Sequence, residues 1–110
     1  MKNIKTFFDE IRNGNVEAIE KMVSENRDYI VAIDERGSTP LILATYYNHT
    51  EIANILLNHD ADIDAKDASG NSALMGVCFK GFTELAEFLI AKGADTVSYT
   101  HLTLPTILLV

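Results

Sequence analysis

The chain has 110 residues, of which 47% are hydrophobic, and a formal net charge of −7 at pH 7. This size and composition predict one globular domain with a single core, and they exclude a disordered chain or a polytopic membrane protein. The acidic balance argues against nucleic acid as the main partner, because phosphate binding depends on clustered Lys and Arg.

The N-terminal segment MKNIKTFFDEIRNG contains no apolar stretch of signal-peptide length, since Asp9 and Arg12 fall early in it. It therefore gives no indication of export, and we expect a cytoplasmic protein. The chain has one cysteine, Cys78, so no internal disulfide can form. Its apolar neighbours predict a buried small side chain and not a reactive thiol.

The sequence repeats itself at a spacing of 33 residues. Matched pairs at this spacing include Asp34 and Asp67, Gly37 and Gly70, Leu41 and Leu74, Glu51 and Glu84, Leu56 and Leu89, and Asp62 and Asp95. The N-terminal third follows at a spacing of 34, and we place its extra residue in DYIVAIDERG. A repeat domain over residues 1–96 is predicted, with units at about 3–33, 34–66 and 67–96.

Each unit is predicted to contain two short helices. In unit two, Thr39 can cap a helix whose first residue is Pro40, and the helix should end near Asn48, where unit three has Gly81. Thr50 then opens a second helix with an apolar stripe at helical spacing. The polar, turn-rich segment DADIDAKDASG predicts a hairpin-like arm between units.

The segments GSTPLILATYYNHTEIANILLNHDADIDAKD and GNSALMGVCFKGFTELAEFLIAKGAD resemble successive ankyrin repeats, and the resemblance covers about residues 3–96. It is weakest in the first unit. It implies an all-α ankyrin repeat solenoid of about three helix-turn-helix units with short hairpin-like loops. The usual His of the family is replaced by Ile42 and Met75, and Ala73 replaces the usual Pro; these changes should weaken the repeats without changing the fold.

The C-terminal segment Val97–Val110 breaks the repeat and has no Asp, Glu, Lys or Arg. At 14 residues it is too short to span a membrane as a helix, which needs about 20. Within it, SYTHLTL alternates as an added strand would. The third interpretation, which we favour, is that residues 97–106, VSYTHLTLPT, resemble the translation of a transposon-type sequencing adaptor. Residues 97–110 are then a non-native or disordered tail, and the natural chain continues past Thr96.

Two groups of residues invite a metal-site hypothesis. The loop DADIDAKD resembles a calcium loop, but its sixth position is Ala65 instead of Gly and its twelfth is Asn71 instead of Glu, which favours ordinary turn chemistry. The three histidines have no metal-ligand spacing, and we expect His49 to form a local hydrogen bond. No nucleophile or phosphate-loop motif stands out, so we predict no enzyme activity, metal or cofactor.

The ankyrin resemblance also implies a partner-binding surface. In such solenoids the variable positions face outward, at the arm tips and at the end of the first helix of each unit. Carried over position by position, the partner-binding residues are Arg12, Asn13, Glu35, Arg36, Ser38, Tyr46, Tyr47, Lys66, Ala68, Ser69, Asn71, Phe79 and Lys80. Tyr47 is the favoured exposed anchor. Tyr46 and Phe79 either share that role or stack on each other between repeats.

The sequence thus predicts a monomeric protein-protein interaction module that binds a protein through its arm tips and concave helix face. An alternative is the N-terminal targeting fragment of a longer ankyrin-containing enzyme or secreted effector. A third hypothesis is a homo-oligomer formed through the uncapped end of the array.

Overall fold

The computed structural model describes residues 3–94, and the tail predicted at residues 97–110 lies outside this range. The described residues form six α-helices and one 3₁₀ helix, and their only β-type pairing is an isolated bridge between Lys66 and Ser72. The elements in chain order are α1 (Asn3–Asn13), α2 (Val16–Glu25), η1 (Arg27–Val31), α3 (Pro40–Tyr46), α4 (Thr50–Asn58), α5 (Ala73–Lys80) and α6 (Thr83–Ala91).

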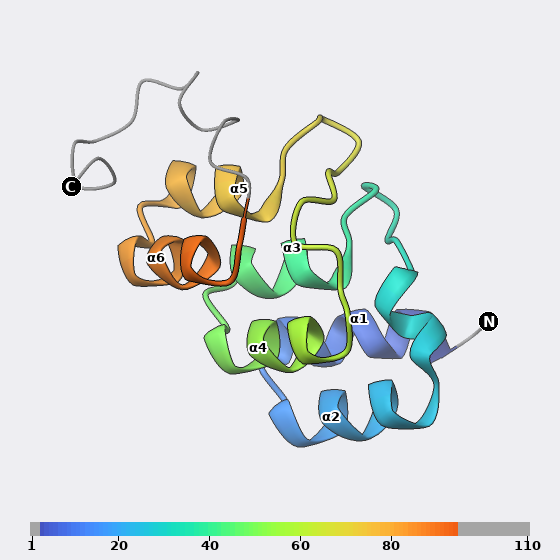
Figure 1. Ribbon diagram of the computed structural model, residues 1–110. Helices are drawn as coiled ribbons and strands as arrows, with labels where there is room; N and C mark the ends of the chain where they lie inside the picture. The colour runs from blue at the N-terminus through green and yellow to red at the C-terminus, as the bar shows by residue number, and fades with distance from the viewer. Residues whose placement is uncertain (1–2, 95–110) are drawn as a thin grey trace.

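The helices form three pairs, α1 with α2, α3 with α4, and α5 with α6, which follow one another across the molecule (Figure 1). The first helices of the pairs pack in sequence, α1 on α3 and α3 on α5, and we call them the inner layer. The second helices, α2, α4 and α6, form the outer layer. The predicted all-α array of helix pairs is confirmed.

Local sequence signals begin and end the helices as predicted. The Thr39 hydroxyl accepts a hydrogen bond from Ile42 N at 3.1 Å, ahead of Pro40 at the first helical position. Ser72 caps α5 in the same way. Both inner helices then end beside a residue with positive φ, Asn48 at 62° and Gly81 at 77°.

The predicted arms are confirmed as tight turns, which we call arm one (residues 32–39) and arm two (residues 65–72). In arm one the Asp34 carboxylate accepts hydrogen bonds from Arg36 N and Ser38 N, each at 2.9 Å. In arm two Asp67 bonds the residues two and four positions later at 2.9 and 3.0 Å. The 33-residue spacing therefore reflects the same side-chain-closed turn formed twice.

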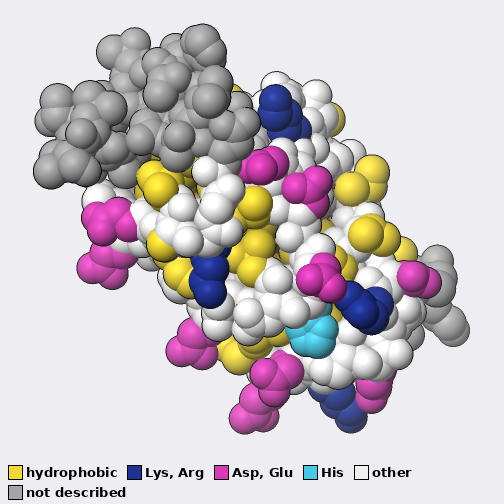
Figure 2. All heavy atoms as spheres, viewed as in Figure 1, with side chains coloured by type: hydrophobic (Ala, Val, Ile, Leu, Met, Phe, Trp, Pro, Cys, Tyr) yellow, Lys and Arg dark blue, Asp and Glu magenta, His cyan; other side chains and the backbone are white. Residues whose placement is uncertain are grey.

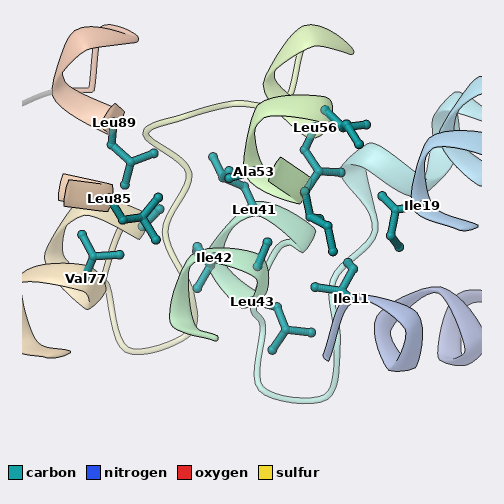
Figure 3. Packing of buried hydrophobic residues seen from close by; sticks show 14 of the residues in the cluster. Ile11, Ile19, Leu41, Ile42, Leu43, Ala53, Leu56, Val77, Leu85 and Leu89 are labelled. Atoms are coloured by element: carbon teal, nitrogen blue, oxygen red, sulfur yellow. The ribbon is translucent and has the colours of Figure 1, made fainter. Parts of the chain in front are cut away.

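One continuous apolar core joins the three units (Figure 3). Ile11 and Ile19 of unit one, Leu56 of unit two and Leu89 of unit three are all fully buried. Each pair alone would leave an apolar face in water, so stacking supplies most of the stability. Cys78 is buried in this core, as predicted, and burial raises the pKa of its thiol.

The location of the extra residue in unit one differs from our prediction. Helix α2 has ten residues where α4 and α6 have nine, whereas the connections at residues 26–39 and 59–72 are equal in length. The extra residue therefore lies in α2 and not in DYIVAIDERG. The start of that segment folds into η1, a conformation that the second connection does not adopt.

Candidate partner-binding groove

An open groove of about 730 Å³ lies between the inner layer and the two arms. Its floor comes from α1 and α3, and arm one forms most of the facing wall, with the tip of arm two at its end. The lining residues are Ile4, Lys5, Phe8, Asp9, Arg12, Ile33, Asp34, Glu35, Arg36, Ser38, Ile42, Leu43, Tyr46, Tyr47, Asp67 and Ser69.

The groove brings together about half of the partner-binding residues predicted from the sequence. Those that line it are Arg12, Glu35, Arg36, Ser38, Tyr46, Tyr47 and Ser69. Those that lie outside it are Asn13, Lys66, Ala68, Asn71, Phe79 and Lys80. The difference arises because the groove spans units one and two, whereas the position-by-position transfer treated all three units alike.

Two of the predicted partner-binding residues, Ser38 and Ala68, pack within the arms. Ser38 is 9% exposed, so it offers little surface to a partner. Ala68 faces Gly37 of arm one, where an added Cβ would lie 2.9 Å from Ala68 N. The arms thus stand in contact and form one wall.

The sequence interpretation missed the contribution of α1 and of one arm residue. Ile4, Lys5 and Phe8 of α1 line the groove, as does Ile33 of arm one, whose side chain is 61% exposed. The repeat pattern is weakest in unit one, so no family position pointed to these residues. One signal was present: Ile33 is apolar at the position where the next unit has Lys66.

The aromatic side chains contradict one of our two interpretations of Tyr46 and Phe79, namely that their rings stack on each other. Tyr46 and Tyr47 are 46% and 43% exposed, and their rings meet edge to face with centroids 5.4 Å apart. The Nζ of Lys80 lies 4.5 Å from the centre of the Tyr46 ring. The ring of Phe79 is 62% exposed, and it does not contact the Tyr46 ring. The stacking of Tyr46 on Phe79 was therefore wrong.

Charged groups hold arm one against α1. The Arg12 guanidinium lies 2.9 Å from Asp9 Oδ1 and 3.9 Å from Asp34 Oδ2. The Asp34 side chain is only 10% exposed and also closes the turn of arm one. This network links arm one to α1 along one side of the groove.

His49 connects unit one to unit two, which corrects the local hydrogen bond that we expected. Its Nε2 lies 3.2 Å from the backbone oxygen of Arg12, 37 residues earlier in the chain. Its ring also faces that of Tyr47, with centroids 6.3 Å apart and planes 18° apart. The His49 ring thereby packs against the Tyr47 side chain that lines the groove.

Residues 3–94 contain neither a cluster of metal ligands nor a membrane-spanning helix. No group of three or more His, Cys, Asp or Glu side chains is close enough to hold a metal ion. No helix there has the length and apolar character needed to cross a bilayer. The groove itself offers exposed aromatic and aliphatic surface bordered by charges, which is the composition of a binding surface.

A family profile described as "Ankyrin repeats (3 copies)" matches residues 8–100. The chain belongs to the ankyrin repeat family. Ankyrin repeats are generally protein-protein interaction modules. The resemblance stated from the sequence is confirmed, with three ankyrin repeats in residues 8–100.

The curated relatives share these ankyrin repeats across most of the present chain. Mouse "Ankyrin repeat and SAM domain-containing protein 6" is 29% identical over 89 residues, 80% of this chain and 10% of the relative. Human "Protein phosphatase 1 regulatory subunit 27" is 29% identical over 89 residues, 81% of this chain and 58% of the relative. Human "Ankyrin repeat and SOCS box protein 3" is 33% identical over 87 residues, 76% of this chain and 17% of the relative. The chain thus spans less than two thirds of each of these proteins.

Proposed function

We propose that this ankyrin repeat protein binds a protein partner in the groove over units one and two. One observation carries the proposal: the exposed side chains of Ile33, Tyr46 and Tyr47 line one groove, together with the charged groups of Arg12 and Asp34. Aromatic side chains provide large contact area at low entropic cost and are enriched among binding hot spots.

The rim of the proposed surface is formed by the arm tips, of which Glu35 and Arg36 also line the groove, and by Lys80, which lies outside it. Glu35 and Arg36 project from arm one and are exposed, as are Lys66 and Ala68 in arm two. Such rim charges influence the rate and selectivity of association more than its affinity. We therefore assign affinity to the groove and selectivity to the rim.

The relatives support a regulatory or adaptor role. By name, one relative is a regulatory subunit of protein phosphatase 1, and in others ankyrin repeats accompany a SAM domain or a SOCS box. By analogy we propose that the present chain is a cytoplasmic adaptor that acts as a monomer. Sedimentation of the purified chain tests the monomer, and a concentration-dependent dimer would support the oligomer hypothesis instead.

The proposal is tested with a double variant, R36A and Y47A, and a matched outer-layer control, E51A and E87A. Each chain is immobilised, and proteins captured from an extract of the source cells are identified by mass spectrometry. A groove partner should be lost with R36A and Y47A and retained with the control. Equal capture by both double variants, or equal loss, would reject the groove as the binding site.

A second candidate is that these repeats target a longer enzyme or effector. It is supported by relatives in which the matched region makes up only 10% or 17% of the protein. Sequencing the native transcript past the codon for Thr96 distinguishes the two. A catalytic domain there would favour the targeting role, and a polar capping helix followed by a stop codon would favour the adaptor.

A further inference from the structure

We propose that Asn13 is a site of spontaneous deamidation, and that the contact between units one and two controls how fast the reaction occurs. The site lies outside the groove and requires no partner. Three features support it: the dipeptide Asn13–Gly14, the exposure of the Asn13 side chain, and the contacts of His49 with the residues beside it.

The sequence around Asn13 favours the reaction. Deamidation begins when the backbone nitrogen of the next residue attacks the side-chain amide carbon, and a glycine there has no Cβ to block the approach. Asn13 is the one asparagine of the 110-residue chain that precedes a glycine. Asn3, Asn15 and Asn54 precede Ile or Val, whose branched side chains hinder the attack, and the other four precede Arg, His or Ser. Asn13 is therefore the most reactive asparagine of the chain.

The reaction needs only solvent. The Gly14 nitrogen loses its proton to a solvent base and bonds to Asn13 Cγ, while the bond between Cγ and Nδ2 breaks and Nδ2 takes up a proton and leaves as ammonia. Water then opens the resulting succinimide at either carbonyl carbon. One product is an aspartate with the normal backbone. The other is an isoaspartate, whose backbone runs through the former side chain and is longer by one carbon atom.

The Asn13 side chain is accessible, but the attacking nitrogen is held in a turn. Asn13 is the exposed last residue of α1, and its side-chain amide forms no hydrogen bond with any residue of the described range. Gly14 N donates to Ile11 O at 3.1 Å. Asn15 N donates to Glu10 O at 3.0 Å, which completes the hydrogen-bond pattern of a helix that ends at a left-handed glycine. The attack therefore requires this turn to open locally.

His49 of unit two holds the same turn closed. Its Nε2 lies 3.2 Å from Arg12 O, the carbonyl oxygen directly before Asn13. Its ring also packs against Gly14, where an added Cβ would lie 2.9 Å from His49 Cε1. Opening the turn disturbs both contacts, so the rate of deamidation in the folded chain depends on how firmly units one and two are joined at this point.

The two products differ in their effect on the joint between the units. Both add a carboxylate to a chain of net charge −7, and Figure 2 shows that acidic side chains already predominate over basic ones on the face displayed. The isoaspartate also lengthens the backbone directly before Gly14, which lies against the His49 ring. The isoaspartyl chain should therefore melt at a lower temperature than both the aspartyl chain and the unmodified chain.

Incubation of the full chain in mildly alkaline buffer, followed by digestion and tandem mass spectrometry, tests the site. Aspartate and isoaspartate are expected at position 13 before any other asparagine is converted, and sooner in the urea-unfolded chain than in the folded chain. If position 13 keeps its amide in the unfolded chain, or if another asparagine of the folded chain is converted first, the assignment of the site is overturned. Equal rates in the folded and unfolded chains would overturn its control by the fold.

H49A and H59A form a matched pair, because His49 and His59 lie at opposite ends of α4. H49A should raise the deamidation rate of the folded chain about twofold to tenfold, which corresponds to the loss of one hydrogen bond, and H59A should leave the rate unchanged. No increase with H49A, or an equal increase with H59A, would overturn the role of the joint.

Circular dichroism checks that each variant folds. If H49A does not, hydrogen exchange of the Gly14 amide in the unmodified chain replaces it, measured at several urea concentrations below the unfolding transition. Exchange and deamidation should accelerate together, because both require the turn to open. Deamidation that does not follow the exchange would overturn the role of the joint.

Discussion

Replacing Gly14 by Ala should destabilise the protein more than the same change at Gly81, although the two glycines occupy equivalent places. Each ends the first helix of its unit with a positive φ, 74° at Gly14 and 77° at Gly81. An Ala in this left-handed region costs about 1–2 kcal/mol of stability, and this cost is the same for the two variants. The surroundings differ: an added Cβ at Gly14 would lie 2.9 Å from His49 Cε1, whereas at Gly81 nothing lies within 4 Å.

The difference between the two variants can be worked out from what the His49 ring would lose by moving. Its hydrogen bond to Arg12 O contributes about 0.5–1.5 kcal/mol, and its contact with the Tyr47 ring about 0.5–1.5 kcal/mol. G14A should therefore lower the free energy of unfolding by about 2–5 kcal/mol and G81A by about 1–2 kcal/mol. Since 1 kcal/mol corresponds to about 4–8 °C in a domain of this size, the two melting temperatures should be clearly separated.

Urea unfolding followed by circular dichroism at the helix band measures both variants, with the m-value as a check that the same surface unfolds. The same pair is then made in an H49A background, where the contact is absent and G14A and G81A should become similar. If the two glycine variants are equally stable in the presence of His49, the steric argument is refuted. If their difference persists without His49, its cause is not this ring.

Three further predictions concern the core, a helix cap and the cysteine. L56A truncates a fully buried side chain and should lower the free energy of unfolding in urea by about 2–5 kcal/mol. L57A, at the half-buried neighbouring residue, should lower it markedly less. Similar losses for the two variants would contradict the stacked core. T39A removes the side-chain acceptor at the start of α3 and should cost about 1 kcal/mol, whereas an unchanged midpoint would show that the cap contributes nothing. Burial raises the pKa of the Cys78 thiol above 9.0, so at pH 8 the folded chain should react with a disulfide reagent far more slowly than the urea-unfolded chain. The stability that this shift provides is fully present below the unfolded pKa and is lost as the pH rises through the folded pKa; equal thiol reaction rates would contradict the burial.

The helix pairs and the arms could be predicted from the amino-acid sequence, because local chemistry specifies each of them. Thr39 followed by Pro40 starts a helix by capping and by a preset φ, and Asn48 and Gly81 end one because they tolerate positive φ. Asp34 and Asp67 close their turns with their own backbone neighbours. Such interactions reach at most a few residues, so a 33-residue period in the sequence becomes a period in the structure.

The position of the groove depends on how the units stack on one another. Stacking places Arg12 beside Asp34 and under His49, residues 22 and 37 positions apart, and no periodicity encodes those pairings. It also decides which side chains stay in water: Ile33 is exposed although apolar, and Ser38 is buried although polar. Exposure depends on how neighbouring units meet, which is a property of the assembled stack and not of any one repeat.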